Sequence, residues 1–292
     1  MRARAVPKDQ LPAISGEDWI DRTRSPYTEG DVAWVPVKEG LAYTREIPER
    51  RRYAGRGFFM LGNVAVIHGK RPQPEDVDGI VSFRHPDGVL WIDSLEDVTR
   101  TPRTEILWGE VGEVCHRESG YVYYLDPKKV MFAQGNLNEK MRMARLISES
   151  PAGSRVADMF AGIGYFTIPM AGSGAQVHAM EINPVSFGYL KKNIQENDLS
   201  LQVQPEPGDC RALLSGAYDR VVMGHFDAIH MLPQVIPHVH EGSVIHLHSI
   251  GTVEGAIREI TEGAGFSPTI EVHKVKKYRP HAWHIVQDVT LS

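Results

Sequence analysis

The sequence predicts an α/β protein in which helices cover both faces of a parallel sheet, preceded by a smaller mixed or mostly β module. Strand-like and helical runs alternate from Ser154 onward, which is typical of a parallel sheet with helical crossovers. Before about residue 125, short β-type runs are instead interrupted by Pro and Gly, as in a small β module. We therefore expect an N-terminal module over residues 1–125 and a second domain over residues 126–292.

The first domain is expected to hold short strands, and a helix is expected to open the second. The β-type runs are Asp31 to Val37, Phe58 to Ile67, Gly79 to Arg84, Val89 to Ile92 and Gly120 to Leu125. Between Val130 and Glu149, apolar residues recur at near-helical spacing, and Asn136 and Asn138 are candidate caps.

The second domain continues with alternating elements. The expected strands are Arg155 to Met159, Gln176 to Met180, Leu201 to Pro205, Asp219 to Met223 and Ser243 to Ser249, with a closing pair near Ile270 to Val275 and Trp283 to Leu291. We expect three helices: one that ends at Ala171, one from Pro184 to Asn197 and one from Val253 to Gly263. This alternation favours an open sheet, in which ligands bind at the carboxyl ends of the strands.

Composition narrows the class of protein. Of 292 residues, 42% are hydrophobic and 24% are charged, which excludes a disordered or fibrous chain. No run of about 18 apolar residues occurs, and no apolar segment follows the N-terminal charges, so we expect neither a membrane span nor secretion. The two cysteines, Cys115 and Cys210, are too few for a disulfide framework, and this predicts a cytoplasmic location.

The net charge of −5 argues against a protein that coats nucleic acid. Two local patches nevertheless carry an excess of +3 each: Arg45 to Arg56, with five arginines against two glutamates, and Ile270 to Arg279, with four cations against one glutamate. Each patch is either a solvated face or a surface for RNA.

The residues from Val156 to Phe166 form the strongest motif. An apolar strand ends at Asp158, and Phe160, Gly162 and Gly164 lie in the loop that opens the next helix. Small residues at this point let the backbone approach a ligand. Thr167 stands where a dinucleotide-binding loop would have a third glycine, so the motif indicates either another nucleoside ligand or a tight turn.

Two further strand ends carry acids. Glu181 ends the next predicted strand, 23 residues after Asp158, where a carboxylate can accept hydrogen bonds from ribose hydroxyls. Asp209 and Cys210 follow the third strand, where an adenine amino group would lie. Each acid alone could be a helix cap. The ordered set predicts a Rossmann-like domain that binds S-adenosylmethionine.

The same residues resemble a known group of tRNA-modifying enzymes. Asp158 to Ala171 and Glu181 to Pro184 are similar to the guanosine-37 N1-methyltransferases of archaea and eukaryotes and the related wybutosine-synthesising aminocarboxypropyltransferases. The resemblance includes Val130 to Lys140 and, more loosely, Ile106 to Gly109 and the tail with Lys277 to Pro280, Trp283 and His284. It implies a class I S-adenosylmethionine-dependent transferase that acts on tRNA.

The residues after the fourth strand distinguish two branches of this group. The methyltransferases carry an Asn-Pro motif there, whereas this chain has Gly224, His225, Phe226 and Asp227. The resemblance therefore implies transfer of the α-amino-α-carboxypropyl group to 4-demethylwyosine at position 37 of phenylalanine tRNA, with methylthioadenosine released, in wybutosine biosynthesis. The alternatives are guanosine-37 N1-methylation and an RNA-binding protein whose cofactor site is vestigial.

The resemblance also assigns site residues. It implies that Ala133 contacts the donor through its backbone and that Lys140 could hold the methionine carboxylate. It places Glu181 at the ribose, and Asp209 with Cys210 at the adenine. The family often has Ser at the position of Ala133 and Arg at that of Lys140. Lysine keeps the charge that could hold a carboxylate but not the bidentate fork; a solvated helix residue is the other reading.

Histidines and aromatic residues complete the candidates. His225 is a candidate contact to the substrate base or a packing residue. Three aromatic residues could stack on the base or fill the core: Phe160, Tyr165 and Phe166. His246 and His248 share a strand face, and with His238 and His240 they raise the possibility of a metal site. No cysteine or carboxylate lies nearby at ligand spacing, so we expect no metal.

Overall fold

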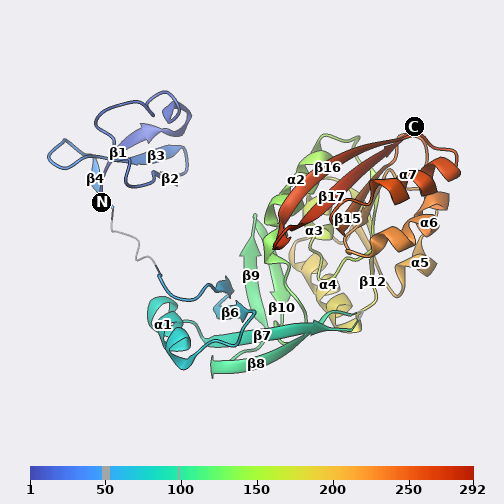
Figure 1. Cartoon of the computed structure of the whole chain (residues 1–292), viewed down its shortest axis with the longest axis horizontal. Coiled ribbons are helices and arrows are strands. Elements are labelled where there is room, and N and C mark those ends of the chain that lie inside the picture. Colours follow the sequence, from blue (N-terminus) through green and yellow to red (C-terminus); the bar gives the residue numbers. More distant parts are fainter. Residues whose placement is uncertain (48–52, 98) are drawn as a thin grey trace. The chain divides into compact units, whose positions relative to one another are not determined.

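The computed structural model describes residues 1–47, 53–97 and 99–292, which divide into two compact units, Met1–Ala54 and Gly55–Ser292 (Figure 1). In the first unit, four antiparallel strands are ordered β2-β3-β1-β4. Their bounds are β1 (Arg2–Pro7), β2 (Tyr27–Glu29), β3 (Val32–Pro36) and β4 (Arg45–Glu46), with one 3-10 turn at Lys8–Gln10. Val6, Ala33 and Val35 form its small core.

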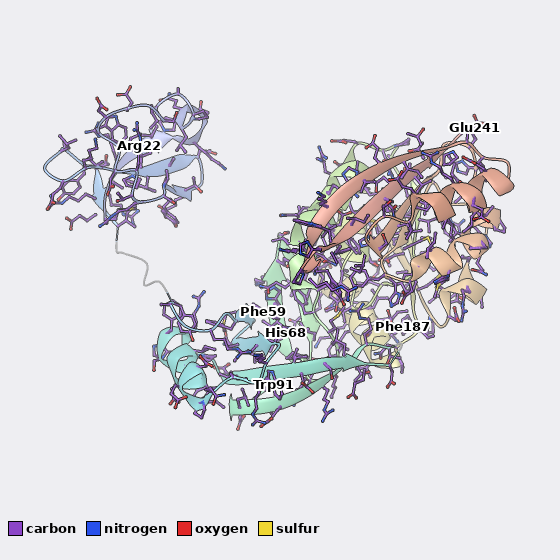
Figure 2. The ribbon with its side chains drawn as sticks, viewed as in Figure 1. Arg22, Phe59, His68, Trp91, Phe187 and Glu241 are labelled. Carbon is purple, nitrogen blue, oxygen red and sulfur yellow. The ribbon has the colours of Figure 1, made fainter. Side chains whose placement is uncertain are left out.

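The second unit begins with a four-stranded sheet ordered β5-β6-β7-β8. Its elements are β5 (Phe59–Leu61), β6 (Val64–His68), α1 (Pro74–Arg84), β7 (Gly88–Glu96) and β8 (Thr101–Gly109). Figure 2 labels Phe59 and His68 on the neighbouring strands β5 and β6; their rings stack with centroids 5.5 Å apart.

Helix α1 corrects one prediction. Gly79 to Arg84 was expected as a strand, and this was wrong because the run is the second half of α1. Pro74 occupies the first turn, Gln73 and Asp76 form a capping box, and Val77 and Ile80 are buried at helical spacing. These start signals lie upstream of the run and outweigh the strand preference of its β-branched residues.

The hairpin of β9 (Val114–Glu118) and β10 (Tyr121–Leu125) leads into the seven-stranded sheet. Tyr123 and Leu125 share an apolar cluster with Met143 and Ile147 of α2 (Leu137–Ser148). Residue 125, the boundary expected from the sequence, therefore lies inside the second unit, and the compact units divide after Ala54.

The large sheet has the order β13-β12-β11-β14-β15-β17-β16. Strands β11 to β15 are parallel, and β17 and β16 add an antiparallel edge. The bounds are β11 (Arg155–Asp158), β12 (Gln176–Glu181), β13 (Val203–Pro207), β14 (Arg220–Met223), β15 (Val244–Ile250), β16 (Pro268–Arg279) and β17 (Ala282–Leu291). The strand order reverses between β11 and β14, which places a ligand site at their carboxyl ends.

Helices cover both faces of this sheet, as expected. They are α2, α3 (Thr167–Gly172), α4 (Pro184–Glu196), α5 (Cys210–Leu213), α6 (Leu232–Val235) and α7 (Glu254–Gly263), with 3-10 turns at Gln134–Asn136, Ala228–Met231 and Ile236–His238. Val156 and Ala157 are neighbours on β11 but belong to two different apolar clusters. Successive strand residues face opposite sides of a sheet, so the two clusters lie on its two faces. The predicted α/β fold is confirmed.

No helix among the described residues is long and apolar enough to cross a membrane.

Candidate active site

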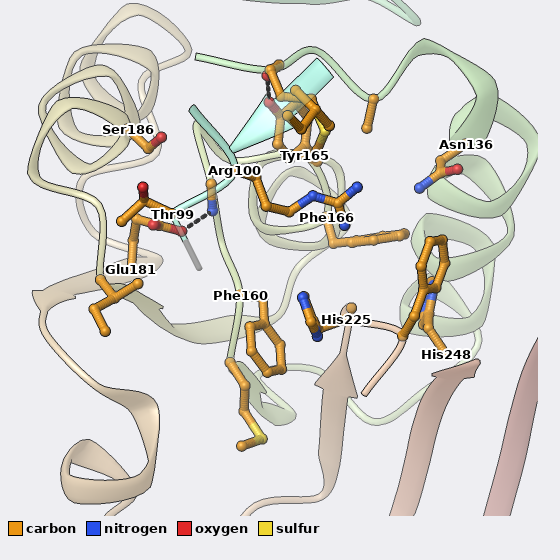
Figure 3. Close-up of a pocket in the computed structure, with 18 of the residues that line it drawn as sticks. Thr99, Arg100, Asn136, Phe160, Tyr165, Phe166, Glu181, Ser186, His225 and His248 are labelled. Carbon is orange, nitrogen blue, oxygen red and sulfur yellow. Dashed lines mark hydrogen bonds between the residues drawn. The ribbon is translucent and has the colours of Figure 1, made fainter. Parts of the chain in front are cut away.

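A pocket of about 820 Å³ opens at the carboxyl ends of the parallel strands. The residues singled out from the sequence that line it are Ala133, Phe160, Gly162, Tyr165, Phe166, Glu181, Asp209, Cys210, His225 and His248. Asp158, Gly164 and Lys140 do not line it. Figure 3 shows Phe160, Glu181 and His225 facing this space. They lie at or just after the carboxyl ends of β11, β12 and β14.

The loop after β11 requires both of its glycines. Gly162 and Gly164 have φ values of 59° and 103°, a region that strains other residues. A Cβ atom at Gly162 would lie 2.4 Å from Tyr165 Cε2, and one at Gly164 would lie 2.7 Å from Ile168 Cγ1. Gly162 thus brings its backbone to the pocket, while Gly164 permits close packing behind it.

Asp158 supports this loop from inside the protein. Its side chain is fully buried, and its Oδ2 atom accepts a hydrogen bond from Thr167 Oγ1 at 2.7 Å. Burial raises the pKa of this carboxyl to about 6 because a charge in the interior loses its hydration. Asp158 therefore ties β11 to α3 and does not itself face the pocket.

Glu181 is held rigidly at the end of β12. Its Oε2 atom accepts from the Gly162 N–H and its Oε1 atom accepts from the Asn183 N–H, both at 2.7 Å. Burial raises its pKa, against the effect of these backbone hydrogen bonds. Each carboxylate oxygen has further lone pairs, so the group can still accept hydrogen bonds from a diol in the pocket.

Asp209 and Cys210 lie at the end of β13. Asp209 caps α5 by accepting from the Arg211 N–H at 3.0 Å and also pairs with the Arg211 guanidinium, whose hydrogen bond lowers the pKa of the carboxyl. Burial raises the pKa of Cys210 to about 11, so the thiol is protonated at neutral pH and is a poor nucleophile.

Lys140 is not where the sequence interpretation placed it. Its side chain is 2% exposed, and its ammonium group pairs with Glu118 of β9 and lies over the rings of Phe132 and Tyr165. Ala133, by contrast, lines the pocket just before the 3-10 turn. An ammonium group already neutralised by a buried carboxylate is not available for a ligand carboxylate.

Three other cations line the pocket, and one of them, Arg211, is paired with Asp209. Arg100, in the turn between β7 and β8, and Lys276, on the edge strand β16, both line it, and no carboxylate pairs with either in the part of the chain that the structure describes. Burial and the neighbouring Arg100 lower the pKa of Lys276. The Arg100 guanidinium lies 5.7 Å from the Phe226 ring centroid.

Asn136 adds an unsatisfied acceptor beside these cations. Its Oδ1 atom is buried without a hydrogen-bond partner among the described residues, and the residue lines the pocket. It occupies the N-cap position of α2, but its side chain makes no cap hydrogen bond. A buried polar atom without a partner is costly, which indicates that a ligand completes it. In the sequence, Asn136 is recognisable as a candidate cap and Lys276 as part of a basic patch, whereas no motif indicates Arg100.

His225 follows β14 and stacks on Phe160, with ring centroids 5.4 Å apart and an interplanar angle of 28°. Its Nδ1 atom accepts from the Asp227 N–H at 3.2 Å. Burial, followed by the charge of Arg100, lowers its pKa. The neutral ring therefore carries its proton on Nε2 and can donate a hydrogen bond.

The other histidines are dispersed among different partners. His246 contacts Asp288 and Arg220, His238 contacts the Gly216 carbonyl, and His240 lies 3.4 Å from Asp219. Only His248 of these four lines the pocket. Within residues 1–47, 53–97 and 99–292, no group of three His, Cys, Asp or Glu side chains is arranged to hold a metal ion.

The donor set fits S-adenosylmethionine. Glu181 and Asp209 offer acceptors in the pocket, as a ribose and an adenine amino group require, and Arg100 and Lys276 offer positive charge. The free Asn136 Oδ1 atom can accept from an ammonium group. Acceptors for a nucleoside together with cations for a carboxylate match the two ends of this molecule.

Comparisons with known proteins agree with this geometry. Residues 114–264 match the family described as the TRM5/TYW2 methyltransferase domain. A curated tRNA(Phe) (4-demethylwyosine(37)-C(7)) aminocarboxypropyltransferase of Methanocaldococcus jannaschii is 34% identical over 240 residues, covering 78% of this chain and 95% of the relative.

Solved structures give the same result. The crystal structure of M. jannaschii TYW2 in complex with AdoMet matches with a TM-score of 0.65 and 30% identity, over 81% of this chain and 99% of that one. Trm5b from Pyrococcus abyssi matches with a TM-score of 0.71 and 26% identity, over 99% of both chains. Sequence, fold and pocket thus agree that this chain belongs to the TRM5/TYW2 family of S-adenosylmethionine-dependent tRNA-modifying enzymes.

Proposed function

We propose that this chain acts in the cytoplasm to transfer the α-amino-α-carboxypropyl group of S-adenosylmethionine to 4-demethylwyosine at position 37 of phenylalanine tRNA, releasing methylthioadenosine. The observation that carries the proposal is the residue set after β14. His225, Phe226 and Asp227 stand where the methyltransferase branch has Asn-Pro, and the M. jannaschii relative named for this reaction covers most of the chain.

The pocket would hold the donor through its two ends. Glu181 would accept from the ribose hydroxyls, and Asp209 with Cys210 would lie at the adenine. Arg100 and Lys276 would bind the methionine carboxylate, and Asn136 would accept from the amino group. Bound in this way, S-adenosylmethionine supplies a sulfonium with three substituent carbons, of which the one aligned with the nucleophile is transferred.

Orientation then decides the product. The carbon held in line with the acceptor at about 3 to 3.5 Å is the one that reacts. Cations that hold the methionine arm can direct its γ-carbon, in place of the methyl group, toward the acceptor. Arg100 and Lys276 come from a turn and an edge strand, so they can fix this arm independently of the strand ends that hold the nucleoside.

The tip of the β16–β17 hairpin is the proposed surface for the anticodon region of the tRNA. Lys274, Lys277 and Arg279 are exposed there, beside the half-exposed rings of Tyr278 and Trp283. Exposed cations next to aromatic rings suit phosphates and unstacked bases. Tyr278 also contacts Phe226, a pocket residue, edge to face, so this surface is continuous with the site.

The other basic patch is only partly described. Arg50, Arg51 and Arg52 lie outside the described residues, Arg45 pairs with Glu29, and Arg56 donates to the His68 carbonyl.

We propose that the N-terminal residues assist tRNA binding. The TYW2 structure matches 81% of this chain, about the share of the second unit, whereas Trm5b matches 99%. Hydrogen exchange of the full chain tests this: added tRNA should protect amides of β1 to β4.

Two labelled donors test the reaction. Hypomodified phenylalanine tRNA is incubated with S-adenosylmethionine labelled either in the methyl carbon or in the carboxyl carbon. Carboxyl label should enter the tRNA with release of methylthioadenosine. Methyl label in the tRNA would instead establish N1-methylation of guanosine 37, and absence of both labels despite tRNA binding would indicate a vestigial site.

Salt and substitution test the tRNA surface. Affinity should fall as salt rises, and Lys277→Ala with Arg279→Ala should reduce the slope of log affinity against log salt by about 1 for each lost phosphate contact. Lys191→Ala, an exposed lysine on α4, is the control and should leave the slope unchanged. Affinity that does not depend on salt would contradict the proposal.

A further inference from the structure

Two histidines of the pocket wall form a buried pair. His248 of β15 and His284 of β17 are each 1% exposed, both line the pocket, and His248 Nδ1 lies 2.9 Å from His284 Nε2. The remaining ring nitrogens, His248 Nε2 and His284 Nδ1, are buried and have no hydrogen-bond partner in the described chain. Each ring also packs edge-on against a pocket aromatic, Phe166 and Phe226 respectively (Figure 3 labels Phe166 and His248).

The shared hydrogen bond links the tautomers of the two rings. A neutral imidazole has one N–H donor and one acceptor nitrogen. If His248 donates to His284, then His248 Nε2 is an acceptor and His284 Nδ1 carries a proton; the opposite arrangement exchanges these roles. In either state the pair offers one acceptor and one donor at its outer nitrogens, so a proton accepted at the outer nitrogen of one ring is shared with the other ring through their hydrogen bond.

The reaction proposed above requires a proton acceptor. The ring carbon of the base that bonds to the γ-carbon bears a hydrogen. As the new C–C bond forms, the C–S bond breaks and its electron pair leaves on the neutral thioether, and the positive charge passes to the base. Loss of the proton from the attacked carbon restores the aromatic ring. The products are the substituted base, methylthioadenosine and one proton, so atoms and charge balance.

Other acids and bases of the pocket are less suited to accept this proton. Neutral His225 carries its proton on Nε2, because its Nδ1 atom already accepts from the Asp227 N–H. Glu181 is assigned to the ribose hydroxyls of the donor in addition to its two backbone donors, and Asp209 is paired with Arg211. Asp227, an exposed carboxylate, is the main competing candidate, and Asp97 and His68 also line the pocket.

We propose that the His248–His284 pair accepts the proton released from the acceptor carbon and passes it through the shared hydrogen bond; this rests on the proposed function. Burial lowers the pKa of His248 well below its usual value and that of His284 to about 4. Lys276 opposes protonation of His284. Around His248, its partner His284 opposes protonation most, His246 and Arg142 also oppose it, and Asp288 favours it. Both imidazole rings are therefore neutral at neutral pH. The substituted base is a cation that loses its proton readily, so even a weakly basic imidazole can accept that proton.

A deuterium isotope effect tests the relay. Single-turnover rates are measured with tRNA that carries hydrogen or deuterium on the acceptor carbon. In the wild-type enzyme, bond formation should limit the rate and deuterium should have little effect. In His248→Gln and His284→Gln, the rate should fall about 100-fold or more, and deuterium should now slow the reaction, because proton loss has become limiting.

Two substitutions serve as matched controls. His246→Gln removes another buried histidine from the same strand, outside the pocket, and should lower stability without an isotope effect. Asp227→Asn should likewise leave the isotope effect unchanged; an isotope effect in this variant alone would overturn the relay in favour of Asp227.

Binding and spectroscopy provide readouts apart from turnover. Both glutamine variants should bind S-adenosylmethionine with wild-type affinity in calorimetry. In the free wild-type protein, ¹⁵N shifts should show two neutral rings at pH 7. Protonated imidazole rings at pH 7 would overturn the relay. Glutamine variants whose rate and isotope effect equal those of the wild-type enzyme would also overturn it. Failure of the wild-type enzyme to form any product would refute the proposed function itself, which separates the two cases.

Discussion

The carboxylate of Glu181 accepts a hydrogen bond from the backbone of Gly162 at 2.7 Å, joining the end of one parallel strand to the glycine loop that follows its neighbour. A second backbone donor, Asn183, holds the other oxygen. The orientation of this acid is thus set before any ligand arrives, and such preorganisation lowers the cost of binding.

Glu181→Ala should abolish donor binding, and Glu181→Gln should weaken it about 10- to 100-fold, since a hydrogen bond to a charged group contributes about 1.5–3 kcal/mol. Methylthioadenosine should lose affinity to the same degree, because it has the same ribose. Isothermal calorimetry measures both ligands. Glu206→Gln, an acid on the next strand that contacts His178, is the control. Micromolar binding retained by Glu181→Ala would remove the main support for the site.

Arg100 should distinguish donor from product. Arg100→Gln should weaken S-adenosylmethionine about 10- to 100-fold, the size expected for a charge-assisted hydrogen bond, but leave methylthioadenosine unchanged, because the product has no carboxylate. Arg103→Gln, an exposed arginine on β8 near Asp93 and Glu96, should affect neither ligand. An equal loss for both ligands would place Arg100 at the nucleoside or in a purely structural role.

Local patterns were sufficient to predict the core of this site. The alternation of strands and helices, the glycine loop and the acids at three strand ends are all read within short windows, and the structure places Gly162, Glu181 and Asp209 around one pocket. The pairing of His248 with His284, by contrast, depends on the register of β15 with β17, which no local pattern specifies.

Lys140 and Arg100 show why the remaining contacts could not be predicted. Lys140 matches a family position in sequence, but its partner Glu118 is supplied by a strand 22 residues earlier and reaches it only through tertiary packing. Arg100 lies in a turn and carries no motif; it becomes a pocket residue because the β7–β8 turn is fixed to Asn183, whose side chain donates to the Thr99 carbonyl.

The Lys140–Glu118 pair should matter for folding and not for the ligand. Lys140→Met leaves a buried carboxylate unpaired and should lower the free energy of unfolding by about 3–5 kcal/mol. The double variant Lys140→Met, Glu118→Gln should recover much of this loss. Lys192→Met, which removes a surface pair with Glu113, should cost less than about 1 kcal/mol. Denaturant unfolding measures all three. A folded Lys140→Met protein that has lost donor affinity alone would restore Lys140 to the site.

Asp158 should make stability depend on pH in a defined direction. Its pKa is raised from 3.8 to about 6 in the folded protein, so the folded state binds the proton more tightly than the unfolded state. This contribution is fully present below pH 3.8 and is lost as the pH rises through about 6. Two pKa units correspond to about 3 kcal/mol. Asp158→Asn, which cannot ionise, should therefore become more stable relative to wild type by up to about that amount between pH 4 and pH 8. Chemical denaturation across this range measures the difference, and a difference that stays constant with pH would show that Asp158 is already ionised throughout.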